Sequence, residues 1–589
     1  MSKRKAWEAK GKRVESGPQK AGPREPARTG EPKPASHATS VAAIRETVES
    51  IVIAFILAFL FRTFEAEAFV IPTGSMAPTL MGRHKDVVCP KCGNEYQVSA
   101  SDSPPDANGN IHAAMVGSGT CPACRNTADL TENNPDRLSH PSFNGDRILV
   151  AKFPFAIHDP SRWDVIVFRY PGEAMTNYIK RLIGLPGETI RIRYGDIWIR
   201  TGEGQFEIAR KPPEKVLAML QPVYDNDLAT KISGELLKWP ARWNSLGGGG
   251  PGDWITSSDK TSFSAGGEAA GGQAAGENWL RYRHLAPSYA QWQDPLVRAA
   301  DPVKPQLIAD FTAYNTGRPG EDEPPDCAAM GIHWVGDLAV QCNLDVQSDS
   351  GEVVFELIKG GRQFRCRIDV ATGQATLGIV GPDTADFHPT AATSVRGKCS
   401  RKIIFSNVDD ELRLWVNGSP IAFDGPTTYD SFALEARMPK EADLSPVGIA
   451  VQKAAVKVSH LKVMRDIYYI AVNDTVSRCL TDFRTSQPDL ADPSSWDRGF
   501  SEPNMNEVEF KLEPPSASHP EKDQFFVLGD NSAQSKDGRL WGPNEYWVNR
   551  ELLIGKALLI YWPHSWDKLP GTSIPFPFFP NFKRMHMVR

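Results

Sequence analysis

Ser75 is the first residue whose setting could support catalysis. It stands in the stretch FVIPTGSMAPTL, residues 69–80, where an apolar run ends at Pro72 and Gly74 allows a tight backbone path. Residues 68–72 are expected to form a strand, so that Ser75 is presented on the turn that follows. A serine hydroxyl is a weak nucleophile unless a base activates it, and no neighbouring His or Asp in the sequence completes a triad. Taken alone, the stretch fits an ordinary strand end.

Lys180 could supply that base. It lies in NYIKRLIGLPGE, residues 177–188, an apolar strand pattern in which alternation is expected to turn either Lys180 or Arg181 inward. A lysine buried among apolar groups loses affinity for its proton, and the neutral amine can then act as general base for a serine hydroxyl. The alternative is that both cations are solvated strand residues.

A third polar stretch follows much later in the chain, VLGDNSAQSKDGRLWG, residues 527–542. Gly-Asp-Asn is turn chemistry. Ser535, Asp537 and Arg539 are spaced two apart, so in an extended segment all three would face one side. By itself this stretch is typical of a polar loop.

Taken together and in this order, the three stretches closely resemble the bacterial type I signal peptidases, or leader peptidases. Residues 145–153 and 162–171 look like two further boxes of that family. Five boxes in the family's order argue strongly against a chance similarity. The resemblance covers roughly residues 41–88, 140–202 and 523–563, which is under half of the chain.

The resemblance implies a Ser/Lys dyad. Ser75 matches the nucleophile and Lys180 the general base. The Thr73 hydroxyl and the Ser75 backbone N–H match the oxyanion donors, which fits the need for donors aimed at developing negative charge. Ser535 matches the hydroxyl that orients the lysine amine. No cofactor is implied for catalysis.

Asp537 and Arg539 match a structural ion pair beside the site. The last box departs from the family's commoner form at Ser532, where Arg is frequent, and at Gly538, where Ser is frequent. Because neither position carries a reacting group, the departure bears on local packing rather than on activity.

The implied activity is that of a membrane-anchored serine endopeptidase that removes signal peptides from exported preproteins. It would cut after small residues in Ala-x-Ala-like sequences, through an acyl-enzyme. The implied location is the bacterial inner membrane, with the N-terminus in the cytoplasm and the catalytic domain on the outer, periplasmic side. An alternative of another class is a surface-anchored binding protein, in which an inactive peptidase scaffold displays the other domains to a glycan or a protein. The intact Ser75 and Lys180 favour the enzyme.

The expected membrane anchor lies just before these boxes. Residues 51–61 form an uninterrupted apolar run of 11 residues, and helical continuation from residue 47 to residue 64 reaches 18, close to the roughly 20 that a bilayer requires. Residues 1–45 carry 11 Lys/Arg and 4 Asp/Glu, so the positive-inside rule places this end in the cytoplasm. The alternatives are a buried core helix and a cleaved signal peptide.

Two Cys-Pro-x-Cys pairs, Cys89/Cys92 and Cys121/Cys124, are typical of a zinc ribbon, in which four thiolates hold a structural zinc ion. The alternative is two local disulfides or redox pairs, which an oxidising compartment favours. His112, between the pairs, is expected to be a loop residue. The five other cysteines are scattered: Cys327, Cys342, Cys366, Cys399 and Cys479.

The remaining length is expected to form insertions within a mainly β protein. Period-two alternation over residues 286–466 suggests a two-sheet jelly-roll sandwich, weakly similar to concanavalin-like and laminin-G-like domains, which often bind carbohydrate. Trp334 and Trp415 are expected in its core rather than as sugar platforms. The expected organisation is a disordered basic tail (1–40), a transmembrane anchor (41–66), a discontinuous catalytic domain (67–204 and 520–589), a zinc-ribbon-like insertion (88–127), a Gly-rich linker (205–285), the sandwich (286–466) and a connector (467–519).

Net charge differs between the basic N-terminal 45 residues and the acidic remainder, and it limits the classes of partner that the protein can bind. The whole chain of 589 residues carries −5, so the part after residue 45 carries −12. An acidic bulk argues against nucleic acid, whose phosphates need a basic surface. The partners that remain are exported preproteins, the lipid bilayer and a glycan or protein ligand of the sandwich.

Overall fold

The computed structural model describes residues 36–60, 66–101, 116–130, 142–231, 239–246, 254–266, 276–317, 331–472, 480–484, 488–499, 505–516, 518, 522–542, 545–569, 572 and 574–589. The chain divides into two compact units, Met1–Phe61 and Arg62–Arg589.

Helix α1 (Ser36–Leu60) is the described part of the first unit. Residues 36–40 are part of this helix, although the sequence placed them in a tail. Among the described residues, no helix combines the length and the apolar character that a membrane crossing requires. The anchor expected at 41–66 is not confirmed, and residues 61–65 lie outside the described part.

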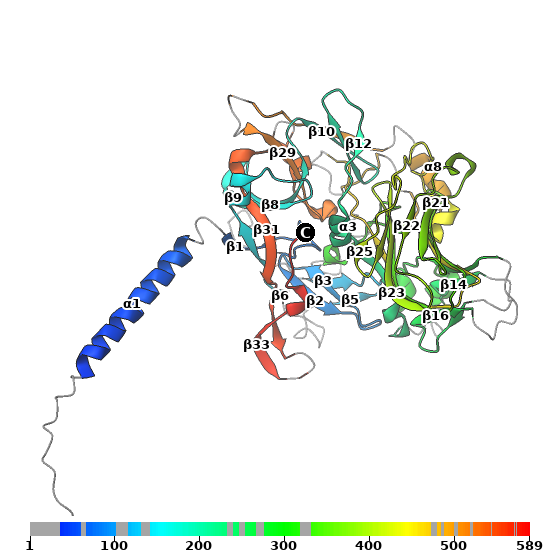
Figure 1. Ribbon diagram of the computed structural model, residues 1–589, viewed down its shortest axis with the longest axis horizontal. Helices are drawn as coiled ribbons and strands as arrows, with labels where there is room; N and C mark the ends of the chain where they lie inside the picture. Colours follow the sequence, from blue (N-terminus) through cyan, green and yellow to red (C-terminus); the bar gives the residue numbers. More distant parts are fainter. Residues whose placement is uncertain are drawn as a thin grey trace, which may run out of the picture. The chain divides into compact units, whose positions relative to one another are not determined.

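A seven-stranded antiparallel sheet holds the segments that resemble peptidase boxes. Its strands lie side by side although they are far apart in sequence, as the blue, cyan and orange-red arrows of Figure 1 show. In spatial order they are β1 (Ala66–Val70), β7 (Arg147–Ala151), β31 (Leu553–Trp562), β8 (Val165–Tyr170), β9 (Glu173–Gly184), β29 (Gln524–Leu528) and β30 (Val548–Asn549). Many Val, Ile and Phe side chains of these strands are buried, in β8 and β29 on both faces, which explains why the sequence indicated them as strands.

A second sheet of four strands packs beside the first through Ile190, Ile192 and Phe526, which share one hydrophobic cluster. It contains β12 (Glu207–Ile208), β11 (Asp196–Thr201), β10 (Glu188–Arg193) and β28 (Val508–Lys511). Strand β28 pairs with β10 in register Ile190↔Phe510. The connector expected at 467–519 is therefore in part a strand of this sheet, a pairing between segments that the sequence pattern could not link.

The sandwich is larger than expected. One sheet contains β15 (Ile255–Thr256), β16 (Ser262–Ala265), β27 (Val456–Arg465), β18 (Leu338–Val346), β23 (Cys399–Val408), β24 (Glu411–Val416) and β25 (Ser419–Pro420), with β13 (Gln221–Asp225) also paired to β27. The other contains β14 (Trp243–Leu246), β17 (Asn278–Tyr282), β26 (Val447–Gln452), β19 (Glu352–Lys359), β20 (Arg362–Asp369), β21 (Gln374–Ile379) and β22 (Thr390–Ala392). Their inner faces share one apolar cluster, and the two layers are seen in green and yellow in Figure 1.

The segment 205–285 is thus not a linker, because strands β13 to β17 lie within it and join both sheets of the sandwich. Each of these strands is only two to five residues long, and β13, β16 and β17 pair with strands far along the chain, so neither local alternation nor composition indicated them. The predicted hairpin is present: Gly360 and Gly361 connect β19 to β20 with positive φ values of 58° and 77°. Trp334 and Trp415 are buried, as predicted, but each lies in a separate apolar cluster and not in the one between the two sheets.

Smaller elements complete the fold. The ribbon region contains a sheet of β3 (Glu95–Ser99), β2 (His84–Val88) and β6 (Ser142–Phe143) and a pair of β4 (Ser118–Thr120) and β5 (Thr127–Asp129); β32 (Ser565–Lys568) pairs with β33 (Pro575–Pro580). Short α-helices are α2 (Pro154–Ile157), α3 (Pro213–Met219), α5 (Tyr289–Gln293), α6 (Pro295–Ala300) and α8 (Trp496–Gly499). The 3-10 turns used below are η4 (Ala313–Thr316), η9 (Ser532–Gln534) and η10 (Gly538–Leu540).

Candidate active site

Ser75 and Lys180 are in direct contact, although they come from segments more than 100 residues apart in sequence. Ser75 lies on the turn that follows β1, and Lys180 projects from β9. The Lys180 amine donates a hydrogen bond of 2.7 Å to the Ser75 hydroxyl and one of 3.1 Å to the Ile179 carbonyl. A nucleophile and a base within hydrogen-bond reach are the geometry that a Ser/Lys dyad requires.

The surroundings of Lys180 favour the neutral amine. Its side chain is 4% exposed, and burial lowers its pKa to about 8. The carboxylates of Asp537 and Asp530 act in the opposite direction, while Arg539 adds to the lowering. A pKa near the working pH is suited to a general base, because an appreciable fraction of the amine is free to accept a proton.

Both cations of the Lys-Arg pair are buried, which corrects the expectation that only one turns inward. Adjacent strand residues face opposite sides of a sheet, and in this fold both sides are covered. Arg181 forms a two-pronged ion pair with Asp530, with distances of 2.7 and 2.6 Å, and neither side chain is exposed. Lys180 faces Ser75 on one side, while Arg181 anchors the Gly-Asp-Asn turn on the other.

The oxyanion donors expected from the sequence are Thr73 and the backbone N–H of Ser75. The Thr73 side chain is exposed, and no hydrogen bond of its hydroxyl to a described residue is found. The Ser75 N–H has no described partner either, whereas the Ser75 carbonyl accepts a 3.1 Å bond from Asn531 N–H. Both donors are therefore available to a substrate carbonyl oxygen.

The support residues lie on the loop after β29. Asp537 and Arg539 form a fully buried ion pair of 2.8 Å, and Asp537 also accepts a 3.0 Å bond from the Gly529 N–H. Arg539 in turn donates to the side chain and the carbonyl of Ser532, at 3.0 and 2.8 Å. The serine that replaces the family's arginine thus accepts hydrogen bonds from Arg539.

Ser535 differs from its expected role. Its hydroxyl is buried but has no hydrogen-bond partner among the described residues, and it makes no bond to the Lys180 amine. The amine is already directed at the Ser75 hydroxyl and the Ile179 carbonyl. Ser535 still lies beside the nucleophile, because a Cβ placed on Gly529 would lie 2.1 Å from its oxygen and 2.3 Å from the Ser75 carbonyl oxygen.

Two residues of the nucleophile's support were missed by sequence reasoning. Asn531 donates a 3.0 Å bond to the Gly74 carbonyl and exchanges bonds of 2.8 and 2.7 Å with the side-chain amide of Asn315. Asn315 lies in η4, 216 positions away within the long insertion. The preceding Tyr314 packs so tightly on the turn that a Cβ on Gly74 would lie 2.0 Å from its ring. The insertion therefore braces the nucleophile turn directly, which no local signal in the sequence indicated.

If Ser75 cleaves peptides as the sequence resemblance implies, replacing Gly529 with alanine is expected to lower the rate of cleavage by about 100-fold or more while the fold persists. The new methyl group collides with the Ser75 carbonyl and with the Ser535 hydroxyl, so the nucleophile must move, and small displacements of reacting groups carry losses of this size. Steady-state kinetics measure the effect. Gly378→Ala is the matched control, because a Cβ there meets nothing within 4 Å. Wild-type rates for Gly529→Ala would show that this contact does not position Ser75.

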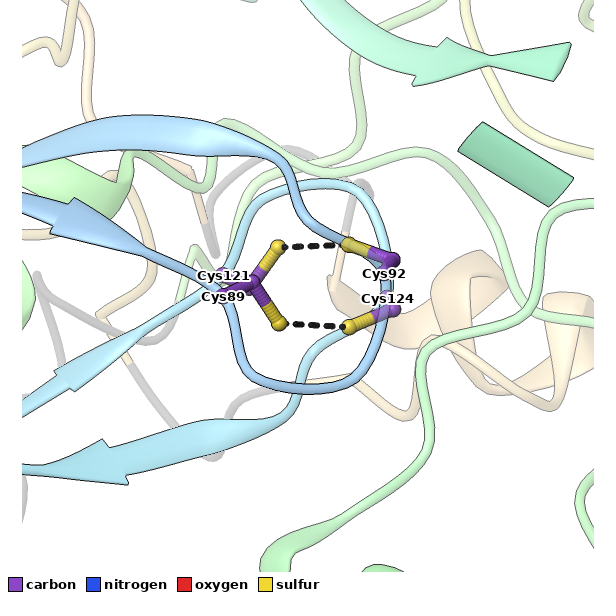
Figure 2. A group of neighbouring side chains, drawn as sticks. All are labelled: Cys89, Cys92, Cys121 and Cys124. Atoms are coloured by element: carbon purple, nitrogen blue, oxygen red, sulfur yellow. Dashed lines mark hydrogen bonds between the residues drawn. The ribbon is translucent and has the colours of Figure 1, made fainter. Parts of the chain in front are cut away.

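The four ribbon cysteines come together on two similar turns. Figure 2 shows their sulfurs pointing toward one another, and one ligand atom from each lies within 4.8 Å of the others. Cys89 and Cys124 sulfurs are 3.5 Å apart, and those of Cys92 and Cys121 are 3.6 Å apart, whereas a disulfide needs about 2.05 Å. Each turn closes with a backbone bond from the fourth residue beyond the first cysteine, Gly93 to Cys89 at 2.8 Å and Arg125 to Cys121 at 2.9 Å.

Of the other cysteines, Cys342, Cys366 and Cys399 are unpaired thiols, and the first two are buried in the sandwich core. Cys327, Cys479 and His112 lie outside the described residues.

Comparison with known proteins points to the same segments. The family described as "Signal peptidase, peptidase S26" matches residues 44–98, 136–227 and 471–562. These three segments are similar to signal peptidases. The third begins near residue 471, which agrees with the strand found in the expected connector and not with a boundary at residue 520.

Individual relatives carry the name signal peptidase I. The chain is 51% identical over 59 residues to that of Pseudomonas aeruginosa, 35% over 77 residues to that of Leptolyngbya laminosa and 28% over 144 residues to that of Rickettsia bellii. These matches cover 8%, 12% and 24% of this chain. The chain spans 21%, 37% and 35% of the lengths of these relatives.

Among solved structures, a Bacillus subtilis protein of unknown function with a galectin-like fold is 10% identical, with a TM-score of 0.23, over 42% of this chain and 98% of its own. The carbohydrate-binding module CBM66 from Bacillus subtilis is 5% identical, with a TM-score of 0.21, over 38% of this chain and 95% of its own.

Proposed function

We propose that this protein is a serine endopeptidase of the signal peptidase I type, with Ser75 as nucleophile and Lys180 as general base. The observation that carries the proposal is the 2.7 Å hydrogen bond between a buried lysine amine and a serine hydroxyl, in segments similar to signal peptidases. The low exposure of Lys180 and its pKa of about 8 support its role as a base.

In the proposed reaction, the neutral Lys180 amine takes the Ser75 hydroxyl proton as the serine oxygen attacks the scissile carbonyl carbon. The Ser75 N–H and the Thr73 hydroxyl donate to the carbonyl oxygen as it becomes negative. Lys180 passes the proton to the leaving amine as the C–N bond breaks, which leaves an acyl-enzyme on Ser75. Lys180 then takes a proton from water, the resulting hydroxide attacks the ester, and the proton returns to Ser75 as the acid product leaves.

The substrates we propose are exported preproteins, cut after Ala-x-Ala-like sequences at the outer end of the signal peptide's apolar segment. We also propose that residues 41–66 anchor the enzyme in the bacterial inner membrane, with the basic N-terminus in the cytoplasm and the catalytic domain on the outer side. Ser75 comes only about ten residues after this segment in the sequence, so the nucleophile would work close to the membrane surface.

A structural zinc ion is proposed for Cys89, Cys92, Cys121 and Cys124. Four converging thiol groups on paired turns fit tetrahedral zinc, and the proposal is supported by all four cysteines being free thiols rather than members of local disulfides. The ion would hold the two turns together. Trp292 of the insertion donates a 3.0 Å bond to the Cys124 carbonyl, so the ribbon would also support the insertion.

The proposed activity is tested with the full chain in detergent and a preprotein that carries an Ala-x-Ala site. We expect one new N-terminus, immediately after the second Ala, in intact-mass and N-terminal analysis. The same preprotein with both Ala replaced by Leu should stay uncut, because the proposed specificity is for small residues. Ser75→Ala serves as the enzyme control, and Ser161→Ala, at an exposed turn, as its matched variant. Equal cleavage by wild type and Ser75→Ala would contradict the proposal.

A further inference from the structure

Two histidines and an aspartate converge beside the nucleophile turn, outside the dyad and outside the ribbon. His84 and Asp86 lie two residues apart on β2 and so share one face of the strand, and His564 lies between β31 and β32. One ligand atom from each residue lies within 4.8 Å of the other two. Both histidines are buried, with 0% of His84 and 6% of His564 exposed.

His84 is held in the tautomer that a metal ligand needs. Its Nδ1 lies 2.7 Å from the Gly82 carbonyl oxygen, so Nδ1 carries the hydrogen and Nε2 presents its lone pair. This Nε2 is buried without a hydrogen-bond partner among the described residues and lies 3.8 Å from Asp86 Oδ1. Metal-binding histidines usually donate their second ring N–H to a carbonyl or carboxylate, which aims the other nitrogen at the ion.

His564 is buried with its polar atoms unsatisfied. Its Nε2 is 2.9 Å from Asp86 Oδ2, yet neither ring nitrogen has hydrogen-bond geometry to a described residue. The Phe143 ring stacks on it, with 4.3 Å between centroids, and fixes its plane. Buried polar atoms without partners are costly, so the Nε2 atoms of His84 and His564, which lie 3.8 and 2.9 Å from oxygens of the same Asp86 carboxylate, indicate a missing partner that accepts lone pairs.

The charges around the cluster are compatible with a cation. The Gln97 amide donates a 2.8 Å bond to Asp86 Oδ1 and orients the carboxylate. The nearby guanidinium of Arg584 is paired with Asp146 at 2.7 Å, which compensates its positive charge.

We propose that His84, Asp86 and His564 form a second metal site, which binds a divalent transition-metal ion, Zn²⁺ in the first place. Imidazole nitrogens and a carboxylate oxygen are ligands that Zn²⁺ prefers, and a water molecule would complete the tetrahedron. The ion would join two segments that are almost 500 residues apart in sequence, β2 and the start of the C-terminal hairpin.

The site would also stabilise the nucleophile turn. Gly82, whose carbonyl accepts the His84 hydrogen bond, packs against the backbone of Thr73, because a Cβ at Gly82 would lie 2.2 Å from the Thr73 carbonyl carbon. An ion bound by His84 would therefore fix the strand on which this packing depends.

Metal analysis of the purified full-length chain tests the proposal. After incubation with Zn²⁺ and dialysis, we expect about two zinc ions per chain, one at each site. His84→Gln and His564→Gln should each hold about one, as should Cys92→Ser, and the combination of Cys92→Ser with His84→Gln about none. His158→Gln, an exposed histidine, is the matched control and should keep both.

The zinc that remains in the ribbon shows that the histidine variants are folded, and circular dichroism checks this independently. Co²⁺ replacement distinguishes the two sites, because sulfur-to-cobalt charge-transfer bands arise only from the thiolates. In His84→Gln, loss of the part of the cobalt d–d absorption that comes from the histidine site, with the sulfur-to-cobalt bands unchanged, would support the proposal. Metal contents of His84→Gln and His564→Gln equal to wild type, for zinc and for every other divalent transition metal measured, would overturn it.

Discussion

Lys180→Met is expected to lower preprotein cleavage by at least about 10³-fold, close to the residual rate of Ser75→Ala. Removal of the base leaves the serine hydroxyl protonated, and members of a catalytic unit cannot compensate for one another. Methionine fills nearly the same apolar space, and a charge need no longer be buried, so the melting temperature should stay the same or rise. Single-turnover kinetics and thermal unfolding measure the two effects.

The pH dependence of kcat/KM is a second test of Lys180 as the general base. Burial lowers the pKa of Lys180 to about 8, so the fraction of neutral amine rises with pH and levels off above that value. In wild type, kcat/KM should therefore increase about tenfold per pH unit below pH 8 and reach a plateau above it. The residual activity of Lys180→Met should lack this step.

Lys536→Met is the matched control, because Lys536 lies on the same loop as the support residues but is exposed. Its rate should stay within about twofold of wild type, as expected for a surface change. The assignment of Lys180 as base fails if Lys180→Met retains the wild-type rate or the wild-type pH profile.

Much of the site could be predicted because its chemistry is encoded in short local motifs. The turn after β1 and the Tyr-Ile-Lys-Arg strand are each contiguous, and the structure brings Ser75 and Lys180 into hydrogen-bond contact. Local motifs could not show whether the Ser535 hydroxyl bonds to the Lys180 amine, because a hydrogen bond depends on side-chain directions in three dimensions. The structure shows no such bond. The role of Asn315 was beyond reach for another reason: it depends on how an inserted domain packs on the turn, and nothing near residue 315 in the sequence refers to Asn531.

In the fold, too, features encoded locally in the sequence could be predicted, and features that depend on distant segments could not. Long alternating strands such as β18 and β20 were evident, because each buries every second side chain in the sandwich core. Strands β16 and β17 are short and depend on distant partner strands: β16 pairs with β27 and β17 with β26, both more than 160 residues further along. The stability of these strands comes from pairing with distant parts of the chain, which local composition does not reveal. The segment 205–285, rich in Gly and Ser, was therefore wrongly predicted to be a linker.

Asp530→Ala is expected to be strongly destabilising, by about 3–5 kcal/mol for the region around β9 and β29. The substitution leaves the Arg181 guanidinium fully buried without its counter-charge, whereas wild type pairs the two groups through bonds of 2.7 and 2.6 Å. A chain with several domains does not unfold in one two-state step, so hydrogen exchange of peptides that cover β9 and β29 is the appropriate measurement. Cleavage should fall as well, because Asp530 adjoins the Gly529 contact with Ser75.

Two further variants separate the cost of an unpaired charge from the loss of an interaction. Asp159→Ala removes an acid that is 82% exposed and paired with Arg550, and should change stability by less than about 1 kcal/mol. The double variant Arg181→Met with Asp530→Ala removes both charges and should be clearly more stable than Asp530→Ala alone, because no ion is left buried without a partner. If the double variant were as unstable as the sum of its single changes, the pair would not act as a unit. Arg181, the buried arginine beside Lys180, would then contribute through packing alone, and the electrostatic account of this face of β9 would be wrong.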